Sequence, residues 1–359
     1  MARIFNFNPG PAVLPLEVLQ QAQAELLDYK GSGMSILEAS HRGKEYMAIH
    51  QEAIDNVRKL LNLPEDYAVL FLQGGASGQF AMVPMNLLGE GQSADYINSG
   101  AWASKAIKEA KLLGKVNVIA DTGKDIPTRL PDPASLKFTA GASYAHLTSN
   151  ETIAGTQWKR FPSAAAPIVA DMSSDMLSRP FDVKPFGLIY AGAQKNLGPA
   201  GVTLVILRKD LAERVSEKVP VIFRYKTHIE ENSLYNTCPT FPIYIVALVT
   251  RWLIAGGGLN AMAKRNAEKA ARIYQVLDES SFYRGTAVKE YRSDMNITFR
   301  LPTEALEEAF IKEASAWSLK GLKGHRSVGG IRASIYNAFP PEGVEALVEF
   351  MKDFEKKNG

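Results

Sequence analysis

The chain has 359 residues, a length that favours two domains over one small core. With 41 basic and 38 acidic side chains its net charge is only +3, which argues against a protein built to bind nucleic acid or a charged membrane surface. Its one cysteine, Cys238, excludes an internal disulfide and a zinc site built on cysteines, and we expect no bound metal.

The first ten residues lack the apolar core of a signal peptide. The most apolar stretch, 242–255, is too short to cross a bilayer and contains Arg251, so it is predicted to be a buried helix. We therefore expect a cytoplasmic protein with no membrane segment.

Apolar runs with strand character alternate with helical patterns along the first two thirds of the chain. Strands are predicted at 68–72, 94–97, 116–119, 144–147, 167–170, 188–190 and 203–207. Helices are predicted at 16–27, 46–61, 78–88, 101–113 and 239–255. This alternation predicts an α/β domain with a mostly parallel sheet. The last two strands are joined by a short connection, which favours antiparallel pairing there.

Three consecutive glycines, Gly256 to Gly258, interrupt this pattern and predict a hinge or a domain boundary. The remaining residues predict a helix at 259–277, a strand at 295–301, a helix at 304–317, a strand at 328–335 and a last amphipathic helix. We expect a large α/β domain at 16–257 and a smaller α+β domain at 258–359, joined by an N-terminal segment, 1–15.

Lys195 is the only charged residue in the turn between the last two predicted strands of the large domain. A lysine enclosed between core strands loses hydration around its ammonium group, which lowers its pKa and frees the neutral amine to attack a carbonyl. That chemistry indicates a Schiff base with pyridoxal phosphate. The simpler alternative is a solvated lysine at a hairpin turn.

The segment from Gln73 to Phe80 follows a predicted strand and opens a helix. Its glycines let backbone amides approach an anion, and Ser77 adds a hydroxyl donor at the helix N-terminus. These features favour a cradle for a cofactor phosphate, although Ser77 could instead only cap the helix. The segment is neither a dinucleotide-binding glycine motif nor a P-loop.

Three further residues follow predicted strands and suit the ring of the cofactor. Asp171 could keep the pyridine nitrogen protonated, Trp102 could stack on the ring, and the hydroxyl of Thr152 could meet its phenolic oxygen. Each has a structural alternative as well, because Asp171 could cap the following turn and Trp102 could belong to the core.

Five cationic side chains lie in three short segments and suit anionic substrates: His41, Arg42, His325, Arg326 and Arg332. The guanidinium group of arginine matches a carboxylate or a phosphate with two parallel hydrogen bonds. Arg332 lies in an apolar run, so it either pairs with an acid or waits for an anionic ligand.

Together these segments resemble the phosphoserine aminotransferase family, which belongs to class V of the fold-type I pyridoxal-phosphate aminotransferases. The resemblance runs almost from end to end. It includes Phe7-Asn-Pro-Gly-Pro-Ala12, Ser40-His-Arg-Gly-Lys44, Asn150-Glu-Thr-Ile153, Tyr190-Ala-Gly-Ala-Gln-Lys-Asn196, Gly198-Pro-Ala-Gly201, Lys323-Gly-His-Arg326 and Arg332-Ala-Ser-Ile-Tyr-Asn-Ala338. It implies a large domain with a seven-stranded, mostly parallel sheet and a smaller C-terminal α+β domain.

The resemblance also implies roles by position. Lys195 would form the Schiff base with pyridoxal phosphate, Asp171 would face the pyridine nitrogen, and Trp102 would stack on the ring. The ring oxygen and the phosphate would be contacted by Thr152, Ala76, Ser77 and Gln194. Some family members have an arginine where this chain has Ser77, so one cationic contact to the phosphate is missing here or supplied elsewhere.

In the family, the pair that matches Asn236 and Thr237 reaches the phosphate from the partner subunit. The resemblance therefore implies an obligate homodimer with two shared active sites. The acidic ends of the substrates would be bound by His41, Arg42, His325, Arg326 and Arg332.

The activity implied is transfer of the amino group of glutamate to 3-phosphooxypyruvate, which gives 2-oxoglutarate and phosphoserine in serine biosynthesis. The related phosphohydroxythreonine step of vitamin B6 synthesis is left open. The alternatives are another class V aminotransferase, such as the alanine–glyoxylate type, and a protein that binds the cofactor without catalysis.

Overall fold

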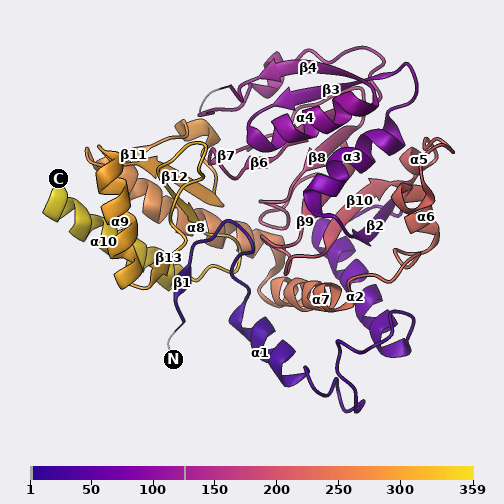
Figure 1. Cartoon of the computed structure of the whole chain (residues 1–359), viewed down its shortest axis with the longest axis horizontal. Helices are drawn as coiled ribbons and strands as arrows, with labels where there is room; N and C mark the ends of the chain where they lie inside the picture. Colours follow the sequence, from indigo (N-terminus) through magenta and orange to yellow (C-terminus); the bar gives the residue numbers. More distant parts are fainter. Residues whose placement is uncertain (1–2, 125–126) are drawn as a thin grey trace.

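The computed structural model describes residues 3–124 and 127–359, and a seven-stranded sheet forms its centre (Figure 1). Across the sheet the strands run in the order β2 (Tyr67–Leu72), β10 (Thr203–Arg208), β9 (Phe186–Gly192), β8 (Ile168–Asp171), β5 (Ala145–Thr148), β3 (Ser93–Asn98) and β4 (Lys115–Asp121). Of these seven, β10 is antiparallel to both of its neighbours, and the other adjacent pairs are parallel. The seven predicted strands, the mostly parallel sheet and the antiparallel pairing beside Lys195 are therefore confirmed.

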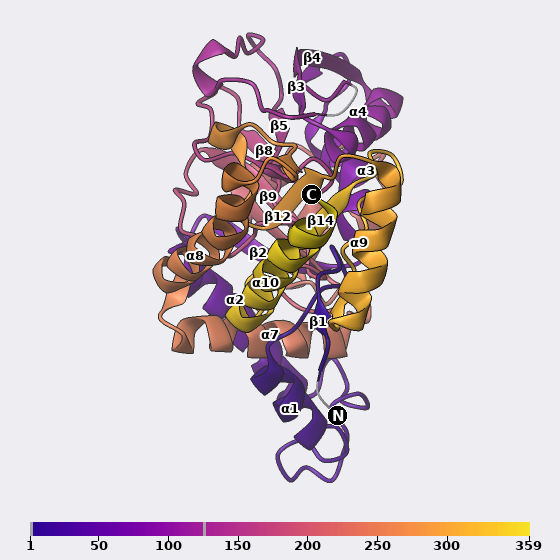
Figure 2. The ribbon, with the colours of Figure 1, turned by 90° about the vertical axis from the view of Figure 1, so that its left-hand side faces the viewer.

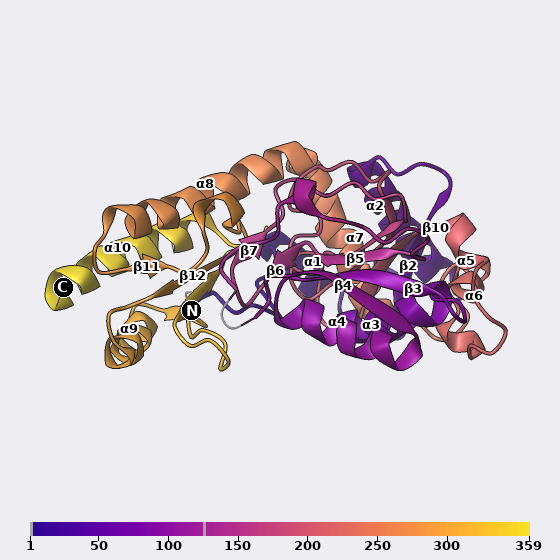
Figure 3. The ribbon, with the colours of Figure 1, turned by 90° about the horizontal axis from the view of Figure 1, so that it is seen from above.

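Helices cover both faces of this sheet, as the view from above shows (Figure 3). One face carries α3 (Gly75–Leu87) and α4 (Ala101–Leu113), and the other carries α2 (Lys44–Leu61) and α7 (Thr240–Ala255), which pack against each other. Shorter helices lie at the periphery: α1 (Leu16–Ala24), α5 (Lys209–Ala212) and α6 (Tyr225–Glu230).

Strand β2 illustrates why both faces need cover, since every one of its residues is buried. Val69 and Phe71 belong to the hydrophobic cluster that includes α2 and α7, whereas Leu70 and Leu72 belong to the cluster that includes α3 and α4. Successive side chains of a strand point to opposite faces, so a strand buried on both faces has an unbroken apolar sequence.

The turn from β2 into α3 is sharper than predicted, because α3 begins at Gly75 rather than at residue 78. Gly74 and Gly75 have φ angles of 94° and 63°, in the left-handed region that glycine adopts without strain. Ala76 and Ser77 therefore lie in the first turn of the helix, at the edge of the sheet where β2 ends.

The C-terminal part of the chain lies at one end of the molecule (Figures 1 and 2). Its antiparallel sheet has the order β11 (Arg284–Gly285), β12 (Asn296–Arg300) and β14 (Ile331–Ser334), so the last strand is shorter than the predicted 328–335. The accompanying helices are α8 (Gly258–Glu279), α9 (Glu304–Ala316) and α10 (Pro341–Asn358). Phe299, Phe310 and Phe354 belong to a hydrophobic cluster of this part. The division into domains at 257/258 stays a prediction.

The chain bends by 85° between α7 and α8. Gly257 and Gly258 have φ angles of 94° and 72° there, which explains why glycines occupy the predicted hinge. Among residues 3–124 and 127–359, no single helix has both the length and the apolar composition to cross a bilayer, and α7 with α8 meets those criteria only as this bent pair.

The N-terminal segment links the C-terminal part to the turn that carries Lys195. Its strand β1 (Phe5–Asn6) pairs in parallel with β13 (Leu319–Lys320), and Phe7 is fully buried in the C-terminal hydrophobic cluster. A few residues later, the backbone N–H of Ala12 donates to the carbonyl oxygen of Gln194 over 2.9 Å. Neither of these two-residue strands is predicted from the sequence.

Candidate active site

Lys195 lies in the turn between β9 and β10, where its side chain enters a cavity of about 250 Å³. The Nζ atom donates to Thr152 Oγ1 over 2.7 Å and to Ser174 Oγ over 3.3 Å. Burial lowers the pKa of Lys195 to about 8, although the negative charges of Asp171 and Glu151 act in the opposite direction. The structure thus places the lysine in an enclosed pocket rather than at a solvated turn, and its amine can lose a proton near neutral pH.

Asp171 ends β8 and lines the same cavity. Its Oδ1 accepts a 2.9 Å hydrogen bond from the backbone N–H of Ser173, so it also caps the following turn. Burial raises the pKa of Asp171, while hydrogen bonding from Ser173 and the charge of Lys195 oppose the rise. A buried carboxylate of this kind is well placed to hold a positive charge on a ligand.

Trp102 and Thr152 form further walls of the cavity. Trp102 lies in the first turn of α4, with its ring centroid 5.7 Å from Nζ of Lys195. Thr152 follows β6 (Asn150–Glu151), which pairs with β7 (Thr156–Gln157), and its hydroxyl is hydrogen-bonded to Ser174 Oγ over 2.8 Å as well as to Lys195.

The start of α3 forms the polar end of the cavity, where Gly75, Ala76 and Ser77 line it together with Gln194. The first backbone N–H groups of a helix have no partner within the helix, and the helix dipole adds positive potential at that end. This arrangement suits a phosphate group, as the sequence predicted.

Two of the predicted substrate-binding residues, His325 and Arg332, also line the cavity. Arg332 lies on β14, is 6% exposed, and its Nε has no hydrogen-bond partner among the described residues. Burial and the positive charges of Arg332, Arg326 and Lys105 lower the pKa of His325. A buried guanidinium whose Nε has no partner among the described residues, and which lies beside further cations, is suited to an anionic ligand.

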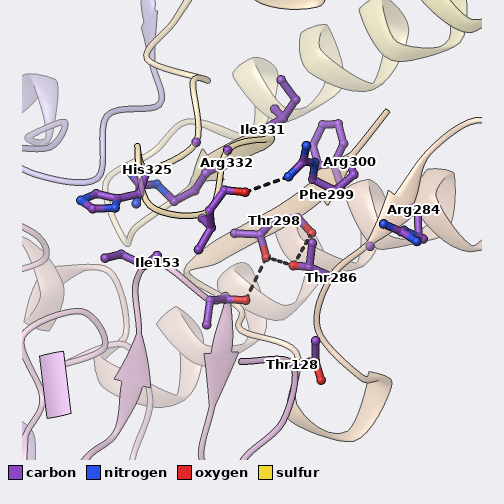
Figure 4. Close-up of a pocket in the computed structure, with 15 residues that line it drawn as sticks. Thr128, Ile153, Arg284, Thr286, Thr298, Phe299, Arg300, His325, Ile331 and Arg332 are labelled. Carbon is purple, nitrogen blue, oxygen red and sulfur yellow. Dashed lines mark hydrogen bonds between the residues drawn. The ribbon is translucent and has the colours of Figure 1, made fainter. Parts of the chain in front are cut away.

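A second cavity of about 380 Å³ adjoins the first and shares Ile153, His325 and Arg332 with it. In Figure 4, His325 and Arg332 point away from the group formed by Thr298 and Thr286, and Arg284 lies at the far end. The hydroxyl of Thr298 donates to the carbonyl oxygen of Ala154, so two polar groups that line this cavity are hydrogen-bonded to each other.

The remaining predicted site residues do not line the cavity within one chain. His41 and Arg42 lie just before α2, where Arg42 Nε is 3.3 Å from His41 Nε2. Thr237 is exposed in the segment before α7, and Asn236 Nδ2 there donates to Gln73 Oε1 over 3.1 Å. The side chain of Arg326 is exposed beside α9. The roles predicted for these five residues stay predictions.

Sequence reasoning missed several residues that the structure brings to the site. Ser174 binds both Lys195 and Thr152, and Glu151 is buried next to Thr152. Lys105 lies with its Nζ 4.3 Å from the Trp102 ring centroid and acts electrostatically on His325. One feature of the sequence could have pointed to Glu151, because it directly precedes the predicted site residue Thr152. No such feature points to Lys105.

The residues of this cavity fit pyridoxal phosphate. An enclosed lysine amine with a lowered pKa suits its aldehyde, and the buried carboxylate of Asp171 suits its ring nitrogen. The indole of Trp102 offers a face for the ring, and the start of α3 offers backbone donors for the phosphate. Within the described part of the chain, no group of three or more His, Cys, Asp or Glu side chains could hold a metal ion.

Comparison with known protein families agrees with this geometry. Residues 4–347 match the family described as aminotransferase class-V. A curated protein from Desulfatibacillum aliphaticivorans, named phosphoserine aminotransferase, is 56% identical over 365 residues, and the alignment covers 99% of each chain.

Solved structures of two such enzymes have nearly the same fold. The phosphoserine aminotransferase of Bacillus circulans subsp. alkalophilus superimposes with a TM-score of 0.98 at 54% identity, covering 99% of both chains. The pyridoxal-phosphate-bound phosphoserine aminotransferase of Trichomonas vaginalis superimposes with a TM-score of 0.94 at 41% identity, covering 98% of this chain and 100% of the other.

Proposed function

This chain belongs to the class V aminotransferases and is a pyridoxal-phosphate-dependent transaminase, and we propose that it transfers the amino group of glutamate to 3-phosphooxypyruvate. The observation that carries this choice of substrates is the group of cations at the cavity that Lys195 enters. His325 and Arg332 line that cavity, and the positive charges of Arg326 and Lys105 act on His325. Glutamate and 3-phosphooxypyruvate both have a carboxylate beside the reacting carbon and a second anionic group at the other end.

When bound, pyridoxal phosphate supplies an aldehyde that takes up the amino group and a conjugated ring that accepts the electron pair left at the substrate α-carbon. Lys195 then acts as general base and acid, because its Nζ can take the α-proton and return it elsewhere on the same face of the ligand. Thr152 and Ser174 orient Nζ through their hydroxyl groups. The pKa of Lys195, lowered to about 8 by burial, makes both protonation states accessible near neutral pH.

Arg332 would bind the α-carboxylate of either substrate through two parallel hydrogen bonds. His325 and Arg326 would bind the distal anion, together with the partner subunit's His41 and the partner subunit's Arg42. The electrostatic effect of Arg326 and Lys105 on His325 supports this assignment, since it indicates that positive charge gathers at the mouth of the cavity.

The proposal includes a homodimer in which each subunit completes the site of the other. Several large apolar side chains are exposed close to Asn236, including Val221, Ile222, Phe223 and Tyr235. Exposed apolar patches of this kind are typical of subunit interfaces. A second copy placed there would bring the partner subunit's Asn236 and the partner subunit's Thr237 towards the phosphate end of the cavity.

We also place the enzyme in the cytoplasm, where a single buried cysteine, Cys238, and the absence of an internal disulfide are ordinary.

The nearest competing function is that of another class V aminotransferase, such as the alanine–glyoxylate type. Alanine and glyoxylate have no second anionic group, so an enzyme that uses them would not require the cations that surround His325.

The test compares amino acceptors with glutamate as donor. We expect kcat/KM for 3-phosphooxypyruvate to exceed that for glyoxylate or pyruvate by about a thousandfold, because a site built to bind an anion discriminates strongly against ligands that lack it. Lys195→Ala enzyme, purified in the same way, serves as the control for contaminating transaminases. Equal use of glyoxylate would assign the chain to the competing function.

A further inference from the structure

Glu151 is a second buried carboxylate beside the cavity, and the transamination chemistry described above gives it no task. It is the last residue of β6, directly before Thr152, and its side chain is fully buried. Ser99 Oγ donates to Glu151 Oε1 over 2.9 Å, whereas Oε2 has no partner among the described residues. Because a buried, incompletely bonded carboxylate is costly, its presence calls for a reason in its surroundings.

Those surroundings are the start of α4. A β-carbon added to Gly100, the residue before α4, would lie only 2.6 Å from Cδ and Oε2 of Glu151, so the carboxylate occupies the space that glycine leaves. The backbone N–H groups of Trp102 and Ala103 act on the same carboxylate and lower its pKa. Acidic groups stabilise helix N-termini in this way, because the first N–H groups lack partners within the helix.

Burial raises the pKa of Glu151 to about 7, and Asp171 adds to the rise. Hydrogen bonding from Ser99 and the N–H groups of α4 opposes it. The charged groups that face Glu151 are Asp171 at the end of β8 and Lys195 in the turn after β9. The carboxylate is therefore close to its titration point at neutral pH, and it lies beside Gly100, at the start of the helix that carries Trp102.

We propose that Glu151 is a positioning residue for the cofactor: it holds the first turn of α4, and so fixes the Trp102 indole as a wall of the pocket. The residue touches neither the cofactor nor a substrate in this account. Its influence reaches them through the helix start, because the carboxylate fills the space beside Gly100, two residues before Trp102, and Trp102 lines the pocket.

The first test measures the dissociation constant of pyridoxal phosphate for the full-length enzyme. Glu151→Ala should raise it by about five- to tenfold, which is the loss expected when an aromatic ring contact becomes disordered. Glu151→Gln keeps the shape of the side chain, so it should raise the dissociation constant of pyridoxal phosphate by less than about threefold. Glu307→Gln is the matched control. Glu307 lies on α9 and is also buried, but it pairs with Arg300 of β12, so its substitution should leave the dissociation constant unchanged.

The second test follows the accessibility of Trp102 to acrylamide, taken as the difference in fluorescence quenching between each enzyme and its Trp102→Phe version. In the wild-type chain this accessibility should change with a midpoint near pH 7, and Glu151→Gln should abolish the change. A pH-dependent change of Trp102 quenching that survives in Glu151→Gln would belong to another group and would count against the proposal.

Gly100→Ala provides an independent variant should Glu151→Ala fail to fold. The φ angle of Gly100 is 167°, which any residue adopts, so the added methyl group acts only by displacing the Glu151 carboxylate. It should raise Trp102 quenching and weaken cofactor binding in the same direction as Glu151→Ala. Unchanged cofactor affinity and unchanged Trp102 quenching in both Glu151→Gln and Gly100→Ala would overturn the proposal.

Discussion

The backbone N–H of Asn337 donates a 3.0 Å hydrogen bond to Oδ1 of Asn196, the residue directly after Lys195. Asn337 follows β14, the strand that carries Arg332, so this bond ties the turn that carries Lys195 to the strand that carries Arg332. Further buried amide contacts continue the link, since Asn337 Nδ2 donates to the carbonyl oxygen of Leu177 and Asn266 Nδ2 donates to Asn337 Oδ1.

We predict that Asn337→Ala lowers the free energy of unfolding by about 1–3 kcal/mol, because it leaves buried polar groups without partners. It should also raise KM for glutamate, since the segment after β14 loses its side-chain bonds to Leu177 and Asn266, although the backbone bond to Asn196 remains. Chemical denaturation and steady-state kinetics measure the two effects. Asn358→Ala removes a side-chain hydrogen bond at the end of α10 and is the matched control, expected to leave KM unchanged.

Lys195 should control the pH dependence of cofactor uptake. Burial lowers its pKa from 10.5 to about 8, so the neutral amine that attacks an aldehyde forms as the pH rises towards 8. The rate at which the cofactor-free chain takes up pyridoxal phosphate should therefore increase with pH, with a midpoint at a pH of about 8, before it levels off. Stopped-flow absorbance measures this rate, and a midpoint near 10 would show that the lysine is not enclosed as described.

Lys195→Ala should abolish transamination while the protein remains folded, because the residue supplies the proton-transfer group and no part of the hydrophobic core. Turnover with glutamate checks the first expectation, and circular dichroism with gel filtration checks the second. Borohydride trapping followed by peptide mass mapping should label residue 195 in the wild-type chain and nothing in the variant.

Substrate binding should require the planar guanidinium group of Arg332 and not only its positive charge. Arg332→Lys keeps the positive charge but loses the planar fork that binds a carboxylate with two hydrogen bonds. We expect it to reduce kcat/KM for both half-reactions by about a hundredfold, which corresponds to one lost bidentate contact. Each half-reaction is followed separately by the absorbance of the cofactor. A loss confined to 3-phosphooxypyruvate would mean that Arg332 binds the phosphate instead.

Arg42 tests the shared site. Arg42→Ala should impair both half-reactions if the partner subunit's Arg42 binds the distal anion. Mixing Arg42→Ala with Lys195→Ala protein and allowing the subunits to exchange should restore activity, because a mixed dimer regains one complete site. Random exchange restores about a quarter of the sites. No recovery after exchange, verified by mass spectrometry of differently tagged subunits, would place Arg42 in the site of its own chain.

The sequence was sufficient for the features that local patterns encode. The seven strands of the main sheet appear as short apolar runs, and their order along the chain with intervening helices is typical of a parallel sheet. Lys195, Asp171 and Thr152 could be proposed from the sequence because each follows such a run, and the structure places all three around one cavity. The turn before α3 was found for the same reason, although its start depends on backbone angles of Gly74 and Gly75 that propensity does not predict.

What was missed depends on contacts between segments far apart in the chain. Strands β1 and β13 have two residues each and no period to detect, and they exist only because the two segments meet. Glu151 is buried beside Gly100. Burial and Asp171 raise its pKa and Ser99 lowers it, and none of these three residues is near Glu151 in sequence. The roles predicted for His41 and Asn236 require a second subunit, so a single chain does not bring these residues to the cavity.

His146 should make the protein sensitive to acid. It is fully buried, with Nε2 2.8 Å from the hydroxyl of Tyr190, its ring stacked 4.8 Å from that of Tyr96, and Nδ1 without a partner in the described residues. Burial lowers the pKa of His146 to about 3. The unfolded chain binds a proton here below about pH 6.5 and the folded chain does not, so this contribution to stability is fully present above 6.5 and lost as the pH falls towards 3.

His146→Phe removes this titration and should reduce the slope of unfolding free energy against pH between 6.5 and 4.5 by up to about 1.4 kcal/mol per pH unit. Burial also lowers the pKa of His50 and His228, so some slope should remain in the variant. Urea unfolding at several pH values measures these slopes, and an unaltered slope in His146→Phe would mean that His146 is protonated in the folded protein.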